Sequence, residues 1–234
     1  MSDFSEAEIK VIAGPEKKSR VVSEHERKLT AYHEAGHAIV MHALPTHDPV
    51  HQITIVPRGG AGGMTISLPT EDRSYQSKRY MEEQIVSLLG GRVAEKLMLG
   101  DISTGASNDI ERATELARKM VTQYGMSDKL GLMALSTVSN PYLDGSTMMN
   151  CADSTSSAAD EEIHKLLMDC YADAKKLLVE HRSLLDEIAM YLLSKETITG
   201  DEFMAYVNAD SKRLTDGSEA EEPPEQTEAP SESE

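Results

Sequence analysis

Residues 29–44 read LTAYHEAGHAIVMHAL and place a histidine, a glutamate and a second histidine within five positions of a largely apolar run. On a helix, the spacing of His33 and His37 puts both imidazoles on one face, one turn apart, where they can bind one zinc ion. Glu34 is displaced around the helix, so it can contact a water activated by the metal and serve as general base. The alternative is a pair of core histidines hydrogen-bonded to carbonyl groups, with Glu34 at the surface.

The sequence around this run predicts a mainly α fold with a small β element. Ser23 and Glu26 form a capping box that begins the central helix, and Pro45 ends it after Leu44. Alternating β-branched residues on both sides of a glycine-rich tip predict two short strands within residues 51–69. Further helices are predicted over residues 3–13, 77–99, 109–124, 155–180, 183–194 and 199–207, with a loop over 134–153.

The composition indicates a globular core followed by an acidic tail. The chain has 234 residues, of which 39% are hydrophobic, and its net charge of −17 argues against nucleic-acid binding. Residues 216–234 carry eight acidic and no basic side chains, and their Pro, Ser and Glu bias predicts disorder. No run approaches the roughly 20 apolar residues that span a bilayer, and the polar N-terminus is no signal peptide. The chain as given is therefore expected to be soluble.

A catalytic zinc ion needs a third protein ligand, and the extended HExxHxxGxxH pattern is absent. Asp109 lies one turn before Ala113, on the apolar face of the helix predicted over 109–124. A carboxylate at this buried edge is costly unless it is paired, and a metal ion would pair it. First-turn helix capping explains Asp109 equally well. Glu95 is the main rival ligand, although Arg92 is its expected ion-pair partner.

The glycine-rich tip RGGAGG, residues 58–63, has no Gly-Lys-Ser/Thr ending and no helix directly after it. The sequence therefore predicts no ATP binding by this chain. The strand that follows the tip is a candidate edge that pairs with an extended peptide through main-chain hydrogen bonds. Its residues are Met64, Thr65, Ile66 and Ser67. A purely structural hairpin explains the same pattern at least as well.

Three separated motifs resemble the peptidase domain of the FtsH-type AAA zinc metalloproteases. They are AYHEAGHA (31–38), LLGGRVAE (88–95) and STGASNDIERAT (103–114). The resemblance covers about residues 1–210, and residues 11–28 resemble the junction between that family's ATPase module and its peptidase domain. It implies a zincin-like helical peptidase domain. The implied boundaries are an ATPase-module remnant at 1–13, a linker at 14–22, the zinc peptidase domain at 23–210 and a disordered acidic tail at 211–234.

The resemblance also implies the chemistry. One Zn²⁺ per chain would be bound by His33, His37 and Asp109, with Glu34 as catalytic base, to hydrolyse peptide bonds of unfolded or membrane proteins. Family members are homohexamers that are anchored in a membrane by N-terminal helices and use ATP in a separate module, and this chain has neither part. The full-length protein is then expected at a bacterial inner membrane, facing the cytoplasm, or at an organellar equivalent. The alternative is a non-catalytic, zinc-stabilised helical module for oligomerisation or interaction.

Overall fold

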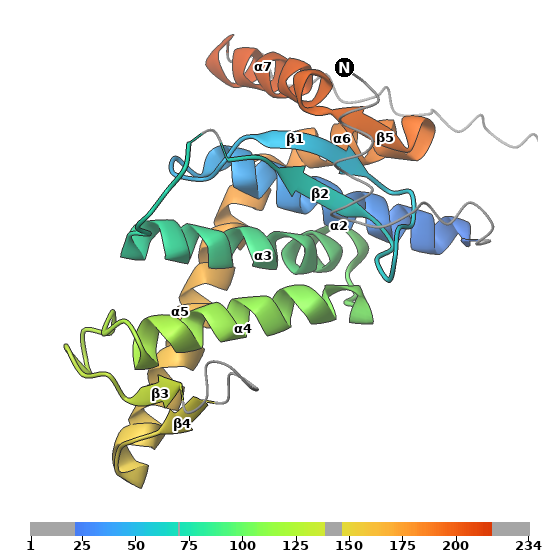
Figure 1. Ribbon diagram of the computed structural model, residues 1–234. Helices are drawn as coiled ribbons and strands as arrows, with labels where there is room; N and C mark the ends of the chain where they lie inside the picture. The colour runs from blue at the N-terminus through green and yellow to red at the C-terminus, as the bar shows by residue number, and fades with distance from the viewer. Residues whose placement is uncertain (1–21, 70, 139–146, 217–234) are drawn as a thin grey trace, which may run out of the picture.

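The computed structural model describes residues 22–69, 71–138 and 147–216, and Figure 1 shows how their elements are arranged. Helices dominate these residues, as the sequence predicts. One antiparallel sheet has the order β2-β1-β5, and β3 pairs with β4 in a second small sheet. The elements are α2 (Glu24–Ala43), β1 (Val50–Thr54), β2 (Met64–Ser67), α3 (Lys78–Leu99), the 3₁₀ turn η1 (Thr104–Ala106), α4 (Ser107–Thr122), β3 (Ser136–Val138), β4 (Thr147–Met149), α5 (Asp153–Glu180), α6 (Arg182–Lys195), β5 (Thr197–Thr199) and α7 (Gly200–Asp216).

The helix α2 lies at the centre of the fold. The Ser23 hydroxyl caps it by accepting a hydrogen bond from the Glu26 backbone N–H at 3.2 Å, and the chain turns extended at Leu44, before Pro45. All ten residues from 31 to 40 are buried, because α3, α6 and the sheet strands β1 and β2 pack around the helix. A helix covered on every side must find a partner for each polar group that it carries.

Two glycines allow α2 and α3 to pack closely. A Cβ atom on Gly36 would lie 2.5 Å from the Cβ of Ala94 and 2.8 Å from the carbonyl oxygen of Gly90. A Cβ on Gly90 would in turn lie 2.9 Å from the carbonyl oxygen of Gly36. The two backbones therefore touch directly, and on either side of this contact the Ser87 carbonyl and the Glu95 side chain of α3 reach the histidines of α2.

The sheet lies against α2 on another side (Figure 1). Its middle strand β1 is held by β2 through the pair Ile53–Thr65 and by β5 through the pair Ile53–Ile198. Ile53 and Ile198 are fully buried, so the register of the sheet is fixed from its core side. Among the described residues β2 pairs only with β1, which leaves β2 at the edge of the sheet.

The predicted strands on both sides of the glycine-rich tip are present and end before Pro57 and Pro69. Other boundaries differ from the sequence predictions. The loop predicted over 134–153 contains β3 and β4, the short strand β5 was not predicted, and α7 continues to Asp216 rather than ending at residue 207.

The helix predicted over 3–13 and the tail from residue 217 onward lie outside the described residues. No helix in the described part of the chain is both long and apolar enough to cross a bilayer.

The α2–α3 contact predicts that Gly36→Ala destabilises the fold. Alanine normally stabilises a helix relative to glycine by up to about 1 kcal/mol. Here its methyl group would overlap Ala94 and the Gly90 backbone, and overpacking of this kind costs about 1–3 kcal/mol. Urea unfolding should show a lower free energy of unfolding for this variant. Gly60→Ala, whose Cβ would meet nothing within 4 Å, is the matched control; equal stability of Gly36→Ala and the parent chain would contradict the close contact.

Candidate metal centre

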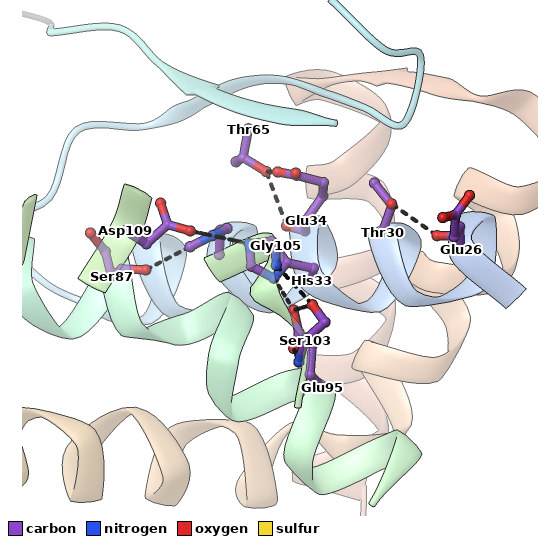
Figure 2. A network of polar contacts seen from close by, with 11 residues as sticks. Glu26, Thr30, His33, Glu34, Thr65, Ser87, Glu95, Ser103, Gly105 and Asp109 are labelled. Carbon is purple, nitrogen blue, oxygen red and sulfur yellow. Dashed lines mark hydrogen bonds and ion pairs between the residues drawn. The ribbon is translucent and has the colours of Figure 1, made fainter. Parts of the chain in front are cut away.

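Three side chains from two helices meet beside the middle of α2. The Nε2 atoms of His33 and His37 are 3.0 Å apart, and the Asp109 Oδ2 atom at the start of α4 is 3.3 Å from the first and 3.6 Å from the second. Both histidines are buried and Asp109 is partly buried. Figure 2 shows Asp109 on its own helix, with its side chain directed toward the side of α2 that carries His33. The structure thus brings together the three residues that the sequence pointed to as metal ligands.

The other ring nitrogens determine where the protons of the two histidines lie. The Nδ1 atom of His37 is 2.8 Å from the carbonyl oxygen of Ser87, and a carbonyl can only accept a hydrogen bond. The Nδ1 atom of His33 is 2.7 Å from Glu95 Oε1. Each Nδ1 therefore carries a hydrogen, and in the neutral rings both Nε2 lone pairs point into the space that Asp109 faces. Three acceptors converging on one point call for a cation between them.

The pKa values show the same preference for positive charge. Burial lowers the pKa of His33, but its hydrogen bonds with Asp109 and Glu95 outweigh burial and raise the pKa to about 10. Burial raises the pKa of Asp109, but the hydrogen bonds with His33 and His37 hold it well below its usual range. The cluster is therefore a site that stabilises a cation and keeps Asp109 ionised.

The spacing of the three atoms fits zinc. Ligands at the usual Zn–N and Zn–O distances of about 2.0–2.2 Å, arranged tetrahedrally, are separated from each other by roughly 3.3–3.6 Å. The observed separations of 3.0, 3.3 and 3.6 Å bracket this range. Two imidazoles and one carboxylate, with the fourth position open, are also a donor set typical of catalytic zinc sites. The residues present therefore fit a zinc ion.

Glu95, the rival ligand from the sequence, has another place in the structure. Its Oε1 accepts from His33 Nδ1, and its two oxygens also accept from the Ser103 hydroxyl at 3.1 Å and the Ser103 backbone N–H at 2.8 Å. Burial raises the pKa of Glu95, but these hydrogen bonds lower it below its ordinary value, so the group stays ionised. Its partners are thus His33 and Ser103, and not Arg92 as the sequence predicted.

Sequence reasoning missed that Glu95 orients His33. A carboxylate that accepts from the second nitrogen of a metal-binding histidine fixes the ring and its tautomer. One signal was available: Gly91 lies one turn before Glu95 on α3, and a Cβ at Gly91 would be 2.5 Å from the His33 ring. A glycine and a glutamate four residues apart therefore mark the face of α3 that receives the histidine.

Glu34 lies on the side of α2 that faces β2. Its side chain is 6% exposed, and the Thr65 hydroxyl donates to its Oε2 at 2.9 Å. Burial raises the pKa of Glu34, while the nearby charges of His33 and His37 and the Thr65 hydrogen bond oppose the rise. The remaining residues of the predicted peptide-binding strand, Met64, Ile66 and Ser67, lie along the edge strand β2, and Ile66 is buried.

Comparisons with known proteins identify relatives of this chain. The family model of peptidase family M41 matches residues 20–206. The chain is 54% identical over 206 residues to the ATP-dependent zinc metalloprotease FtsH 2 of Alkaliphilus metalliredigens and 50% identical over 213 residues to FtsH 1 of Thermoanaerobacter sp.. It is 46% identical over 204 residues to FtsH of Bacillus subtilis. These alignments cover 87%, 90% and 86% of this chain but 30%, 35% and 32% of the relatives, so the chain spans about a third of their length.

The contacts of Glu95 predict that Glu95→Gln weakens zinc binding. The amide keeps the shape and one acceptor but loses the charge that favours the Nδ1–H tautomer of His33, and losses of this kind reduce metal affinity about 10- to 100-fold. Competition with a chromophoric zinc chelator measures the affinity. Glu115→Gln, which changes an exposed glutamate paired with Lys119 on α4, is the control and should bind zinc as the parent chain does. Unchanged affinity in Glu95→Gln would remove the orienting role.

Proposed function

The chain belongs to peptidase family M41, and we propose that it is the zinc-dependent endopeptidase domain of a longer ATP-dependent protease. One observation carries this proposal: His33, His37 and Asp109 converge on one point, with the buried carboxylate of Glu34 beside them. The printed names of the relatives, ATP-dependent zinc metalloproteases, support the same chemistry. A zinc-stabilised module without catalysis would have no use for a buried carboxylate at the position of Glu34.

We infer that His33, His37 and Asp109 would hold the zinc ion, and that Glu95 and the Ser87 carbonyl keep the two imidazoles in the orientation that binding requires. Zinc supplies Lewis acidity, which lowers the pKa of water and polarises a peptide carbonyl. The protein contributes a buried site in which the ligands are aligned before the metal binds, so little side-chain ordering remains to oppose binding.

Glu34 is proposed to transfer the proton. Its carboxylate would accept a proton from the attacking water and then give that proton to the nitrogen of the leaving amine. Burial supports this role, because it raises the pKa of Glu34 toward the range in which a carboxylate can both take up and release a proton.

The edge strand β2 is the proposed substrate platform. An extended peptide can add to an unpaired strand edge through main-chain hydrogen bonds, which every sequence can form. Residues 64–67 provide such an edge, and Thr65 in this strand touches Glu34. A peptide bound along β2 would therefore run next to the proposed base, and modest sequence preference would follow from recognition through the main chain.

The wider assembly is proposed from the family. Polypeptides that are unfolded or located in membranes would be the substrates, a homohexamer the assembly and a membrane the location of the full-length protein. ATP would be used by a module outside this chain, since RGGAGG at 58–63 lacks the Lys and Ser/Thr of a phosphate-binding loop. Alone, the domain should cleave short or unfolded polypeptides and leave folded proteins intact.

Glu34→Gln should abolish hydrolysis and keep the metal. The amide cannot accept the proton, and the loss of a general base costs about 10²–10⁴-fold in rate. Hydrolysis of fluorescently labelled casein measures the rate, and elemental analysis measures zinc. A chelator should inhibit the parent chain, and added zinc should restore it. Glu180→Gln, at an exposed position at the end of α5, should remain fully active. Undiminished turnover by Glu34→Gln would refute the assignment of the base.

Asp109→Ala should lose zinc, which separates the ligand role from first-turn helix capping. Asp153 is the matched control, because it is also an acidic residue in the first turn of a helix. Replacing either aspartate with alanine removes a helix-dipole interaction of about 0.3–1 kcal/mol, but only Asp109 contacts the histidines. Elemental analysis should find about one zinc per chain in Asp153→Ala and far less in Asp109→Ala. A full zinc content in Asp109→Ala would reduce Asp109 to a capping residue.

A further inference from the structure

The hydroxyl of Thr65 links the edge strand β2 to the central helix α2. Its Oγ1 atom lies 2.9 Å from Glu34 Oε2 and 3.0 Å from the Glu34 carbonyl oxygen. Figure 2 draws both contacts as dashed lines. An ionised carboxylate and a carbonyl can only accept, so the hydroxyl is the donor. Its single hydrogen favours the carboxylate, because a hydrogen bond to a charged acceptor is the stronger one.

The position of this hydroxyl is fixed by the sheet. Thr65 is paired with Ile53 on β1, and Ile53 is paired in turn with Ile198 on β5. Both isoleucines are fully buried, and Thr65 shares their face of the sheet as the cross-strand neighbour of Ile53, so a shift of β2 by one residue would turn Thr65 to the opposite face. A shift of one residue would bring Met64 or Ile66 to this place, and neither side chain has a donor for the carboxylate.

The last glycine of the tip RGGAGG lets the strand come this close. A Cβ atom on Gly63 would lie 2.8 Å from Glu34 Oε1 and 2.6 Å from Thr30 Cγ2. The carboxylate of Glu34 therefore has Gly63 beside one oxygen and the Thr65 hydroxyl at the other. A larger residue at 63 would push either the strand or the carboxylate away, so the glycine belongs to the same contact as Thr65.

We propose that Thr65 is a positioning residue for Glu34: it holds the carboxylate through Oε2, leaves Oε1 to exchange the proton, and ties the base to the strand on which the peptide would pair. This inference rests on the proposed endopeptidase function. A carboxylate with a free terminal torsion would sample several orientations, and general-base catalysis requires the oxygen to stay within about 2.6–3.2 Å of the proton it accepts. The peptide backbone and the base then share one rigid reference, the strand β2.

The test compares Thr65→Val with Thr65→Ser. Valine keeps the branched shape that suits a strand and removes the hydroxyl, while serine keeps the hydroxyl. In Thr65→Val, kcat for a fluorogenic peptide should fall about 10- to 100-fold, the loss expected for a hydrogen bond to a charged group, with KM within about threefold of the parent value. In Thr65→Ser, kcat should recover to within about threefold. Zinc content should stay at about one per chain in both variants.

A binding measurement adds a readout that does not depend on turnover. A peptide hydroxamate is a transition-state-like inhibitor, so its binding affinity depends on a correctly placed base. The affinity of an uncleaved D-amino-acid peptide does not depend on the base. Calorimetry should show about tenfold weaker hydroxamate binding to zinc-loaded Thr65→Val, with recovery in Thr65→Ser. Equal hydroxamate affinity in the parent chain and Thr65→Val would contradict the proposal.

Thr122→Val is the matched control for losing a bonded threonine hydroxyl. Thr122 is buried, donates to the Arg118 carbonyl at 2.8 Å, accepts from the Ser136 hydroxyl, and lies thirteen residues along α4 from Asp109, roughly 20 Å at 1.5 Å per residue. This variant should melt at a lower temperature with an unchanged kcat. A loss of kcat here as large as in Thr65→Val would show that general destabilisation, and not positioning, explains the result.

The outcomes separate this inference from the proposed function. No hydrolysis by the zinc-loaded parent chain would overturn both proposals. An active parent with kcat of Thr65→Val within twofold of it, or a loss that Thr65→Ser does not recover, would overturn the role of Thr65 alone. If Thr65→Val does not fold, Thr65→Ser and Thr65→Ala decide the matter, because they differ only in the hydroxyl. A Ser variant at least tenfold faster than the Ala variant supports the proposal, and equal rates overturn it.

Discussion

Two imidazole nitrogens held 3.0 Å apart in the middle of a fully covered helix are the constraint on which the rest of this structure depends. Neither lone pair can turn toward water, since both rings are buried and their Nδ1 hydrogens are committed to Ser87 O and Glu95. A buried polar group without a partner costs on the order of 1–3 kcal/mol, and in the neutral rings the two Nε2 atoms are acceptors that face one another. Asp109 faces the same space, and a cation bound between the three side chains would give both lone pairs a partner.

The close contact of α2 with α3 holds the two imidazole rings in place. Gly36 and Gly90 let the backbones touch, and the same face of α3 then presents the Ser87 carbonyl and the Glu95 carboxylate to the two rings. With neutral histidines and ionised carboxylates, Glu34, Glu95 and Asp109 would carry three negative charges around the rings, and a divalent cation would offset most of this charge. Packing and electrostatics therefore act together, because the close contact of the two helices brings the hydrogen-bond acceptors of α3 to the buried histidines.

The parts of the site that could be predicted from sequence are those that depend on one element at a time. Helical spacing placed His33 and His37 together, and the apolar face of α4 pointed to Asp109 without naming a partner. The role of Glu95 depends on how two helices cross, which periodicity within one helix does not encode. The three-residue strands β3, β4 and β5 are shorter than any reliable alternation pattern, and α4 begins at Ser107 after Ala106, which offers no capping side chain to mark the start.

The proposed base Glu34 and two of the three proposed metal ligands, His33 and His37, lie on the same helix, but different neighbours orient them. His33 and His37 are oriented by α3, whereas the Glu34 carboxylate contacts β2 through Thr65. The proposed recognition of a peptide at β2 through main-chain hydrogen bonds would select little by side chain, so the precision of such a site would lie in the geometry between the strand and Glu34. That geometry is set by the pairing of Thr65 with Ile53 and by the absence of a side chain at Gly63. A glycine-rich tip that looks like a flexible loop in the sequence is, in the folded chain, the reason that the strand can lie against the base.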